Sequence, residues 1–165
     1  MPKKVNIIGG GPSGLMAATI LSDHNYEVTI YDRKPSFGRK FLLAGRGGLN
    51  ITHSENEDDF LKKYGKAADI FKCIFKNFSQ QDLRNWCEKL GENTFVGSSG
   101  RVFPKSFKAS PLLRAWLFQL KKNNVIFKTN YNWLGWEKNK LIFETEKKLI
   151  YIDPFITLLS LGGLS

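Results

Sequence analysis

Apolar residues near the start of the chain gather in two short segments with a helical pattern between them. Residues 4–8 and 27–32 are mainly apolar segments of strand length, which is typical of buried parallel strands. Within residues 12–23, Leu15 and Ala18 recur at the spacing of one helix face. Strand, helix and strand in this order predict a βαβ unit with parallel strands and a right-handed crossover.

The next segment, residues 33–124, interrupts this sheet. Residues 38–54 are rich in glycine and show neither a helical nor a strand period, so they predict a long functional loop. Residues 57–91 predict two or three helices, with Phe71 and Phe75 on an apolar face that we expect to pack in a core.

Two short extended runs and a further helix complete the segment of residues 33–124. Residues 94–96 and 101–103 flank a turn made of glycine and serine. Ser110 and Pro111 then predict the start of a helix that ends at Lys122, with the serine as N-cap and the proline as the first helical residue.

The last part of the chain, residues 125–165, resumes the sheet. Residues 125–128 predict its third strand, and residues 155–161 predict a buried strand that runs into Gly162 and Gly163. Between these strands lie three short runs that predict an antiparallel meander, at residues 131–136, 140–144 and 147–152.

A glycine-rich loop joins the first predicted strand to the first helix. Gly9, Gly11 and Gly14 have the GxGxxG spacing. The first glycine permits the tight turn, the second lets backbone N–H groups approach a phosphate, and the third lets the helix pack close to the strand. Asp32 ends the second predicted strand, where a carboxylate accepts hydrogen bonds from ribose hydroxyls. The pattern predicts a nucleotide diphosphate site at the positive end of the helix.

The order of the elements separates two classes of dinucleotide site. An NAD dehydrogenase usually follows its second strand with a short helix and another strand, whereas here residues 33–124 intervene and a meander then interrupts the sheet. The sequence therefore favours FAD. The predicted fold is α/β and Rossmann-like, with a parallel sheet, a β-meander and a helical insertion.

Composition and charge limit the remaining possibilities. The 165 residues are 42% hydrophobic, which is enough for one core, and their formal net charge is +10. The lysines are scattered, as on solvated helix faces, so nucleic acid is not the favoured partner. No apolar stretch has the length of a signal peptide core or a membrane span, which predicts a cytoplasmic protein without membrane contact.

Few side chains are candidates for catalysis or for metal binding. Cys73 and Cys87 lack the close spacing of a zinc or redox motif, so we expect reduced core thiols and no metal site. His53 follows the glycine-rich segment, but no acidic partner for it is visible in the sequence. No residue is assigned a catalytic role, because a flavin itself carries hydride or electron chemistry.

Four strings carry a family resemblance: GGGPSGLMAA, GRKFLLAGRGGLNITHS, FVGSSGRVFPKSFKASPLLRAWL and LSLGG. Together they resemble bacterial flavoproteins known as NAD(P)/FAD-dependent oxidoreductases or aminoacetone-oxidase-like proteins. The resemblance implies FAD as cofactor and NADH or NADPH as a candidate electron donor. It also implies these cofactor contacts: Gly9, Gly11, Pro12, Ser13 and Gly14 at the diphosphate; Asp32 at the adenosine ribose; and Arg39, Lys40, Gly47, Gly48 and Asn50 near the ribityl chain and flavin ring. Arg33, next to Asp32, is a further candidate. Gly162 and Gly163 follow the last predicted strand at its carboxyl end, where close backbone approach to a cofactor is expected, and the resemblance favours that interpretation.

The sequence departs from this family in two respects. Many members have cysteine where this chain has Leu49, so no thiol chemistry is expected there. Members are also much longer and carry an inserted substrate domain. We therefore interpret residues 1–165 as a partial, truncated FAD-binding domain from which the substrate domain is absent.

The leading hypothesis is the FAD-binding portion of a flavin-dependent oxidoreductase that acts on an unidentified small molecule. One alternative is a flavin-dependent RNA-modifying or RNA-binding protein, which the positive charge would suit. Another is an inactive truncated fragment. The intact glycine loop and Asp32 favour the leading hypothesis over the last of these, since the nucleotide site itself shows no sign of decay.

Overall fold

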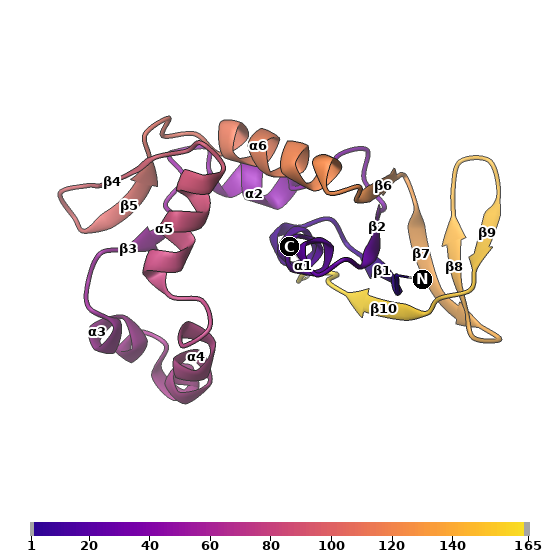
Figure 1. Cartoon of the computed structure of the whole chain (residues 1–165), viewed down its shortest axis with the longest axis horizontal. Helices are drawn as coiled ribbons and strands as arrows, with labels where there is room; N and C mark the ends of the chain where they lie inside the picture. Colours follow the sequence, from indigo (N-terminus) through magenta and orange to yellow (C-terminus); the bar gives the residue numbers. More distant parts are fainter. Residues whose placement is uncertain (1, 164–165) are drawn as a thin grey trace. The chain divides into compact units, whose positions relative to one another are not determined.

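The computed structural model describes residues 2–163, which belong to two units. The first unit comprises Met1–Leu43 and Leu117–Ser165, and the second comprises Ala44–Trp116. Figure 1 shows their elements coloured along the chain.

The first unit is built on a four-stranded parallel sheet in the order β10-β1-β2-β6. Helix α1 (Pro12–Asp23) connects β1 to β2, as predicted. The expected Rossmann-like α/β architecture is therefore confirmed. The strands are β1 (Lys4–Ile8), β2 (Glu27–Asp32), β6 (Ile126–Thr129) and β10 (Ile156–Leu159).

The burial of their apolar side chains explains why β1 and α1 form at the predicted positions. In β1 every residue after Lys4 is buried, which matches a parallel strand covered on both faces. In α1, Leu15 and Ala18 are fully buried, so the predicted helix face is the one that packs. Local apolar pattern and tertiary packing agree in this part of the chain.

The predicted meander is a separate antiparallel sheet in the order β7-β8-β9. Leu141 and Phe143 from its middle strand form a buried cluster with Ile8 and Tyr31, and the rings of Tyr31 and Phe143 stack at 4.5 Å. The meander therefore packs against the carboxyl ends of β1 and β2. Its strands are β7 (Asn132–Glu137), β8 (Lys140–Glu144) and β9 (Leu149–Ile152).

The last predicted strand is shorter and far more exposed than expected. β10 pairs only with β1 and lies at the edge of the sheet. Phe155 is 67% exposed, Leu159 46% and Leu161 57%. The prediction of a buried strand was wrong because a continuous apolar run has the same appearance in a central strand and in an edge strand.

The second unit combines a small sheet with short helices. Its strands pair in the order β3-β5-β4. The Ser79 side chain accepts from the Asp82 N–H, and the Asp82 carboxylate accepts from the Ser79 N–H, so this capping box starts α5 within the segment predicted to be helical. The elements are β3 (Thr52–His53), α3 (Glu57–Lys62), η1 (Gly65–Ala67), α4 (Ala68–Phe75), α5 (Gln80–Lys89), β4 (Thr94–Val96) and β5 (Arg101–Pro104).

Two predictions about local structure need correction. Residues 38–54 are not a continuous loop, because α2 (Arg39–Ala44) and β3 form within them. The α2 residues are good helix formers, but the glycines on either side hid their pattern. Helix α6 (Ala109–Lys122) begins before Ser110, so Ser110 is not its N-cap. Pro111 is tolerated because N–H groups of the first turn have no partner within the helix.

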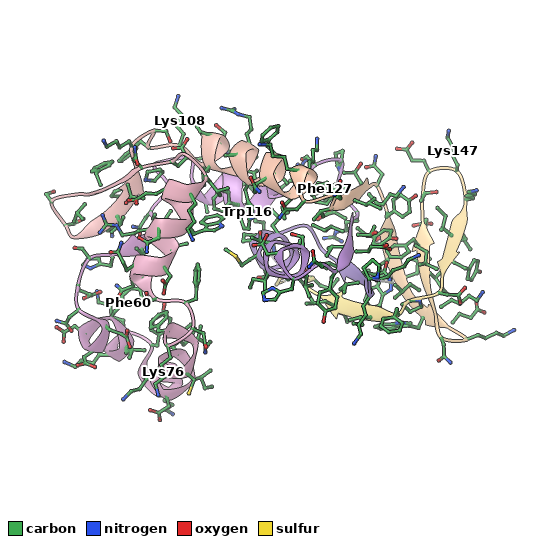
Figure 2. The ribbon with its side chains drawn as sticks, viewed as in Figure 1. Phe60, Lys76, Lys108, Trp116, Phe127 and Lys147 are labelled. Atoms are coloured by element: carbon green, nitrogen blue, oxygen red, sulfur yellow. The ribbon has the colours of Figure 1, made fainter. Side chains whose placement is uncertain are left out.

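The aromatic face of residues 57–91 forms a partly exposed cluster and not a buried core. The ring centroids of Tyr64 and Phe71 are 3.8 Å apart, and those of Phe60 and Phe75 are 5.5 Å apart. Phe60 is labelled among the side chains in Figure 2. None of the α4 residues is buried, and Ile74 is 47% exposed. Short helices α3 and η1 provide too little surface to cover this face.

The two cysteines differ in exposure, which corrects the prediction of two core thiols. Both are free, but Cys73 is exposed and Cys87 is buried. Desolvation raises the pKa of the Cys87 thiol to about 12, so it stays protonated at neutral pH.

We expect the Cys73 thiol to react rapidly with a maleimide at pH 7.5 and the Cys87 thiol to react only after unfolding. Mass spectrometry of the labelled peptides checks this, and rapid labelling of Cys87 would contradict the structure.

Candidate functional site

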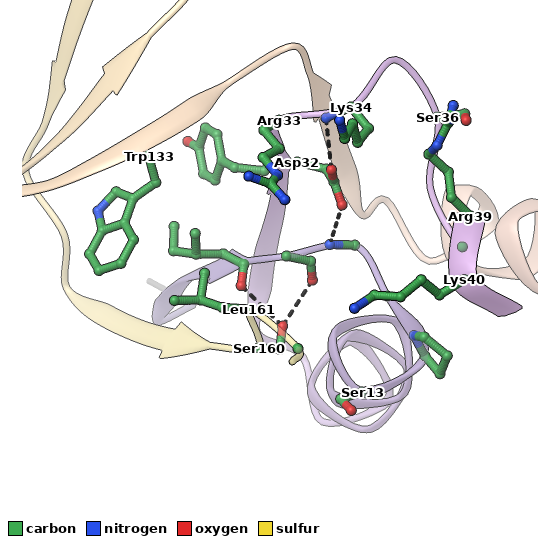
Figure 3. A pocket seen from close by; sticks show the side chains of 18 of the residues that line it. Ser13, Asp32, Arg33, Lys34, Ser36, Arg39, Lys40, Trp133, Ser160 and Leu161 are labelled. Carbon is green, nitrogen blue, oxygen red and sulfur yellow. Dashed lines mark hydrogen bonds between the residues drawn. The ribbon is translucent and has the colours of Figure 1, made fainter. Parts of the chain in front are cut away.

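A cavity opens at the carboxyl ends of β1, β2 and β10, entirely within the first unit (Figure 3). Its volume is about 600 Å³, which lies in the range of about 300–1,000 Å³ typical of small-molecule sites. The glycine loop, the residues after β2, the start of β7 and the residues after β10 line it. Ligands of open α/β sheets bind at this edge.

Two glycines let the segments around the cavity approach closely. Gly9 has φ +108°, and a Cβ there would lie 2.3 Å from the carbonyl oxygen of Ser160. A Cβ at Gly14 would lie 2.0 Å from the carbonyl oxygen of Gly9. Gly9 therefore allows β1 and β10 to meet, and Gly14 allows α1 to pack on the end of β1. Gly14 is buried behind the loop and does not itself line the cavity.

Gly11 leaves open space for a ligand. Its backbone is extended, with φ −80° and ψ −177°, and a Cβ there would have no atom within 4 Å. Gly11 is the N-cap of α1, and no side chain in the described part of the chain caps this helix start. Pro12 and Ser13, the first helical residues, line the cavity. The positive end of a twelve-residue helix therefore faces the open space beside Gly11. This arrangement fits a diphosphate.

Asp32 has a second role that the sequence did not reveal. Its Oδ2 accepts a hydrogen bond from the Gly10 N–H, and its Oδ1 accepts one from the Lys34 N–H, each at 2.8 Å. The carboxylate therefore shapes both the glycine loop and the turn after β2. Each carboxylate oxygen can accept more than one hydrogen bond, so Asp32 keeps capacity for a ribose hydroxyl.

Positive side chains outnumber acidic ones on the cavity wall. Arg33, Lys34, Arg39 and Lys40 line it, and Asp32 is the one acidic side chain among its lining residues. The Lys40 side chain extends from α2 into the cavity (Figure 3), and its Nζ donates to the Gly163 carbonyl oxygen at 3.3 Å. Cations around a helix N-terminus favour a phosphate-bearing ligand.

The structure brings most of the predicted site residues to this cavity. Gly9, Gly11, Pro12, Ser13, Asp32, Arg33, Arg39, Lys40, Gly162 and Gly163 all line it. Gly47, Gly48 and Asn50 belong to the second unit and do not line it. There the Asn50 Nδ2 donates to the carbonyl oxygens of Thr52 and Val102, at 2.7 and 3.1 Å, and so supports its own loop. A flavin contact from these three residues stays a prediction.

His53 does have an acidic neighbour, contrary to the expectation from sequence. Its Nδ1 lies 3.3 Å from Glu55 Oε1, and its Nε2 lies 3.0 Å from the Ser99 carbonyl oxygen. The Gln80 side chain donates to the His53 carbonyl oxygen at 2.7 Å. These contacts tie β3 to the turn before β5 and to α5, which is a structural role. Within residues 2–163, no cluster of side chains suited to a metal ion occurs.

Several further residues line the cavity that were not predicted from the sequence. Tyr131, Asn132 and Trp133 enter it because the meander packs on the end of β2, and no local pattern indicates that contact. Ser160 and Leu161 lie directly before the predicted Gly162 and Gly163, so proximity in sequence could have suggested them.

A parallel sheet with a glycine loop, an open helix N-terminus and an acidic residue at the end of the second strand defines a dinucleotide-binding domain of the Rossmann type. The model of the HI0933-like protein Rossmann domain family matches residues 3–165, so the chain belongs to that family. It is an FAD-binding Rossmann domain of the flavin oxidoreductases, and its cofactor is FAD.

Individual relatives match only parts of their own length. The 3-dehydro-bile acid delta(4,6)-reductase of Clostridium scindens is 27% identical over 124 residues, which are 74% of this chain and 30% of the reductase. A thiamine thiazole synthase of Methanococcus maripaludis is 37% identical over 65 residues, which are 39% of this chain and 25% of the synthase. The chain thus spans less than a third of the length of these relatives.

Solved structures confirm the fold at low sequence identity. The crystal structure of THI4 from Thermovibrio ammonificans is 18% identical, with a TM-score of 0.60 over 98% of this chain and 58% of its own. The 3-ketosteroid-delta4-(5alpha)-dehydrogenase of Rhodococcus jostii is 12% identical, with a TM-score of 0.64 over 95% of this chain and 45% of its own.

Proposed function

We propose that the first unit holds FAD in the cavity described above and serves a flavin-dependent oxidoreductase that acts on a small molecule. The observation that carries this proposal is the space at Gly11, which adjoins a helix N-terminus without a side-chain cap and lies among four cationic side chains. Such a site favours two linked phosphates.

The residue roles follow from position and charge. The first-turn amides of α1 and the cations Arg39 and Lys40 bind the diphosphate. Asp32 accepts from an adenosine ribose hydroxyl while it holds the Gly10 and Lys34 amides. Gly162 allows close backbone approach after β10, where its φ is +75°. When bound, the flavin supplies hydride or electron transfer, and the protein supplies binding, orientation and local charge.

The electron donor and the cell compartment also belong to this proposal. We infer NADH or NADPH as the donor, because a flavin that reduces its substrate must first receive a hydride from another molecule. A cytoplasmic location is supported by two free thiols and no disulfide among the described residues. The helices in the described part of the chain are all too short or too polar to cross a bilayer.

FAD uptake tests the proposed function. Purified protein is mixed with excess FAD, passed through a desalting column and examined by visible absorption. We expect the flavin bands to remain with the protein at about one flavin per chain, and excess ADP to release them, because ADP carries the same diphosphate and ribose. FMN, which lacks the adenosine half, should be retained much less. A colourless protein after this treatment would remove the proposal and favour an inactive fragment.

A second candidate is flavin-dependent modification of RNA. A ribosomal RNA dihydrouridine synthase of Haemophilus influenzae is 41% identical over 49 residues, which are 30% of this chain and 12% of the synthase. The net charge of +10 suits a polyanionic partner. This candidate predicts RNA binding that weakens steeply as the salt concentration rises. The slope of the logarithm of the binding constant against the logarithm of the salt concentration is set by the number of phosphates contacted. RNA binding that is absent at 50 mM salt would exclude it.

A further inference from the structure

The side chain of Ser160 makes an unusual pair of contacts at the floor of the cavity. Its Oγ lies 2.8 Å from the Gly9 carbonyl oxygen and 3.1 Å from the Ile8 carbonyl oxygen, and Figure 3 shows both contacts as dashed lines. A hydroxyl has one hydrogen, so the two carbonyls share it. The Ser160 N–H also donates to the Ile8 carbonyl oxygen, at 2.8 Å.

These contacts fix one end of a flexible peptide group. The peptide that joins Gly9 to Gly10 has its carbonyl oxygen on the Ser160 hydroxyl and its N–H on the Asp32 carboxylate. Its carbonyl oxygen also lies against Gly14, where a Cβ would be 2.0 Å away. Glycine on both sides makes rotation of a peptide group inexpensive, because no Cβ opposes it. Ser160 and Asp32 therefore hold the two ends of the Gly9–Gly10 peptide group by hydrogen bonds and oppose its rotation.

The orientation of this peptide matters for an anion. The C=O and N–H of a trans peptide point in opposite directions, so a half turn would aim the Gly9 carbonyl oxygen at the Asp32 carboxylate and take the Gly10 N–H away from it. Two negative groups would then face each other beside the helix start that attracts phosphates. A donor placed at Ser160 stabilises the orientation in which the Gly9 carbonyl oxygen stays away from the Asp32 carboxylate. The adenosine half of a ligand is neutral, so it is less sensitive to this negative charge than a diphosphate is.

We propose that Ser160 is a positioning residue of the diphosphate site: together with Asp32 it holds the Gly9–Gly10 peptide in the orientation that accepts two phosphates. It thereby favours ligands that carry a diphosphate over those that do not. This inference rests on the proposed function, since it deepens the account of the same cavity.

The test compares Ser160→Ala with Ser160→Thr, which keeps the hydroxyl. The dissociation constants of FAD and ADP are measured by titration, and that of adenosine by ligand-observed NMR. We expect Ser160→Ala to weaken FAD and ADP by about tenfold, as for the loss of one hydrogen bond. Adenosine, which has no phosphate but contacts Asp32 through its ribose, should weaken clearly less than ADP, and Ser160→Thr should restore most of the ADP affinity.

Several outcomes would overturn this inference. Unchanged ADP affinity in Ser160→Ala would overturn it and leave the proposed function intact. An equal loss for ADP and adenosine would show a merely structural role, and the melting temperature without ligand would fall with it. If Ser160→Ala does not fold, Ser160→Cys, which keeps the volume but donates weakly, must show the same selective loss. Failure of the unsubstituted protein to bind both FAD and ADP would remove the proposed function as well.

Discussion

Replacing Gly11 by leucine should abolish measurable FAD uptake without harming the fold. The backbone at Gly11 is extended, so any residue can adopt it, and a Cβ there has open space. The leucine side chain would fill the place that we assign to the diphosphate. We expect FAD affinity to fall at least 100-fold, which corresponds to about 2.7 kcal/mol. Stability without FAD should stay equal or rise by about 0.4–1 kcal/mol, because glycine gives the unfolded chain more freedom.

Opposite effects on affinity and stability make this experiment decisive. FAD affinity is measured by fluorescence titration, and stability by denaturant unfolding without cofactor. Gly11→Ala serves as the graded control, since one methyl group fills less of the space and should cost less affinity. A Gly11→Leu protein that binds FAD as tightly as the unsubstituted protein would show that the diphosphate does not lie at this loop.

Replacing Asp32 by asparagine should weaken FAD binding strongly for a different reason. An asparagine has one acceptor oxygen, so its NH₂ group would face either the Gly10 N–H or the Lys34 N–H, each of which now donates to the carboxylate at 2.8 Å. The loop would lose one fixed amide, and the ribose would lose a charged acceptor. Because hydrogen bonds to charged groups contribute about 1.5–3 kcal/mol, we expect affinity to fall by about tenfold to a hundredfold.

The matched control for Asp32→Asn is Asp153→Asn. Asp153 lies outside the cavity, is largely exposed and pairs with Lys140 at 3.3 Å. Exposed pairs contribute little, so this substitution should leave both FAD affinity and stability almost unchanged. The dissociation constants of the two variants are compared in the same buffer. Equal affinities in Asp32→Asn and Asp153→Asn would contradict the role assigned to Asp32.

Sequence patterns were most informative where local signals and packing agree. The glycine loop, α1 and the first two strands lie where the sequence placed them, because the apolar run before Gly9 and the helix face around Leu15 both end in buried contacts. The capping box at Ser79 is equally local, since both of its hydrogen bonds join residues within one turn.

Sequence patterns were least informative where distant segments meet. The apolar run of β10 gave no sign that the strand lies at an edge of the sheet. The entry of Trp133 into the cavity depends on how the meander packs, and the role of Ser160 depends on a contact with Gly9, far away in the chain. Such contacts are decided by tertiary structure and leave no periodic signal in the sequence.

The central claim is that backbone amides at the start of α1 bind a diphosphate, and an NMR titration of ¹⁵N-labelled protein with ADP tests it most directly. We expect the amide signals of Gly11, Ser13 and Gly14 to move downfield together and to saturate with the same dissociation constant, while the amide signal of Glu27, at the opposite edge of the same sheet, stays in place. ADP that binds yet leaves these three amides unmoved would contradict the account.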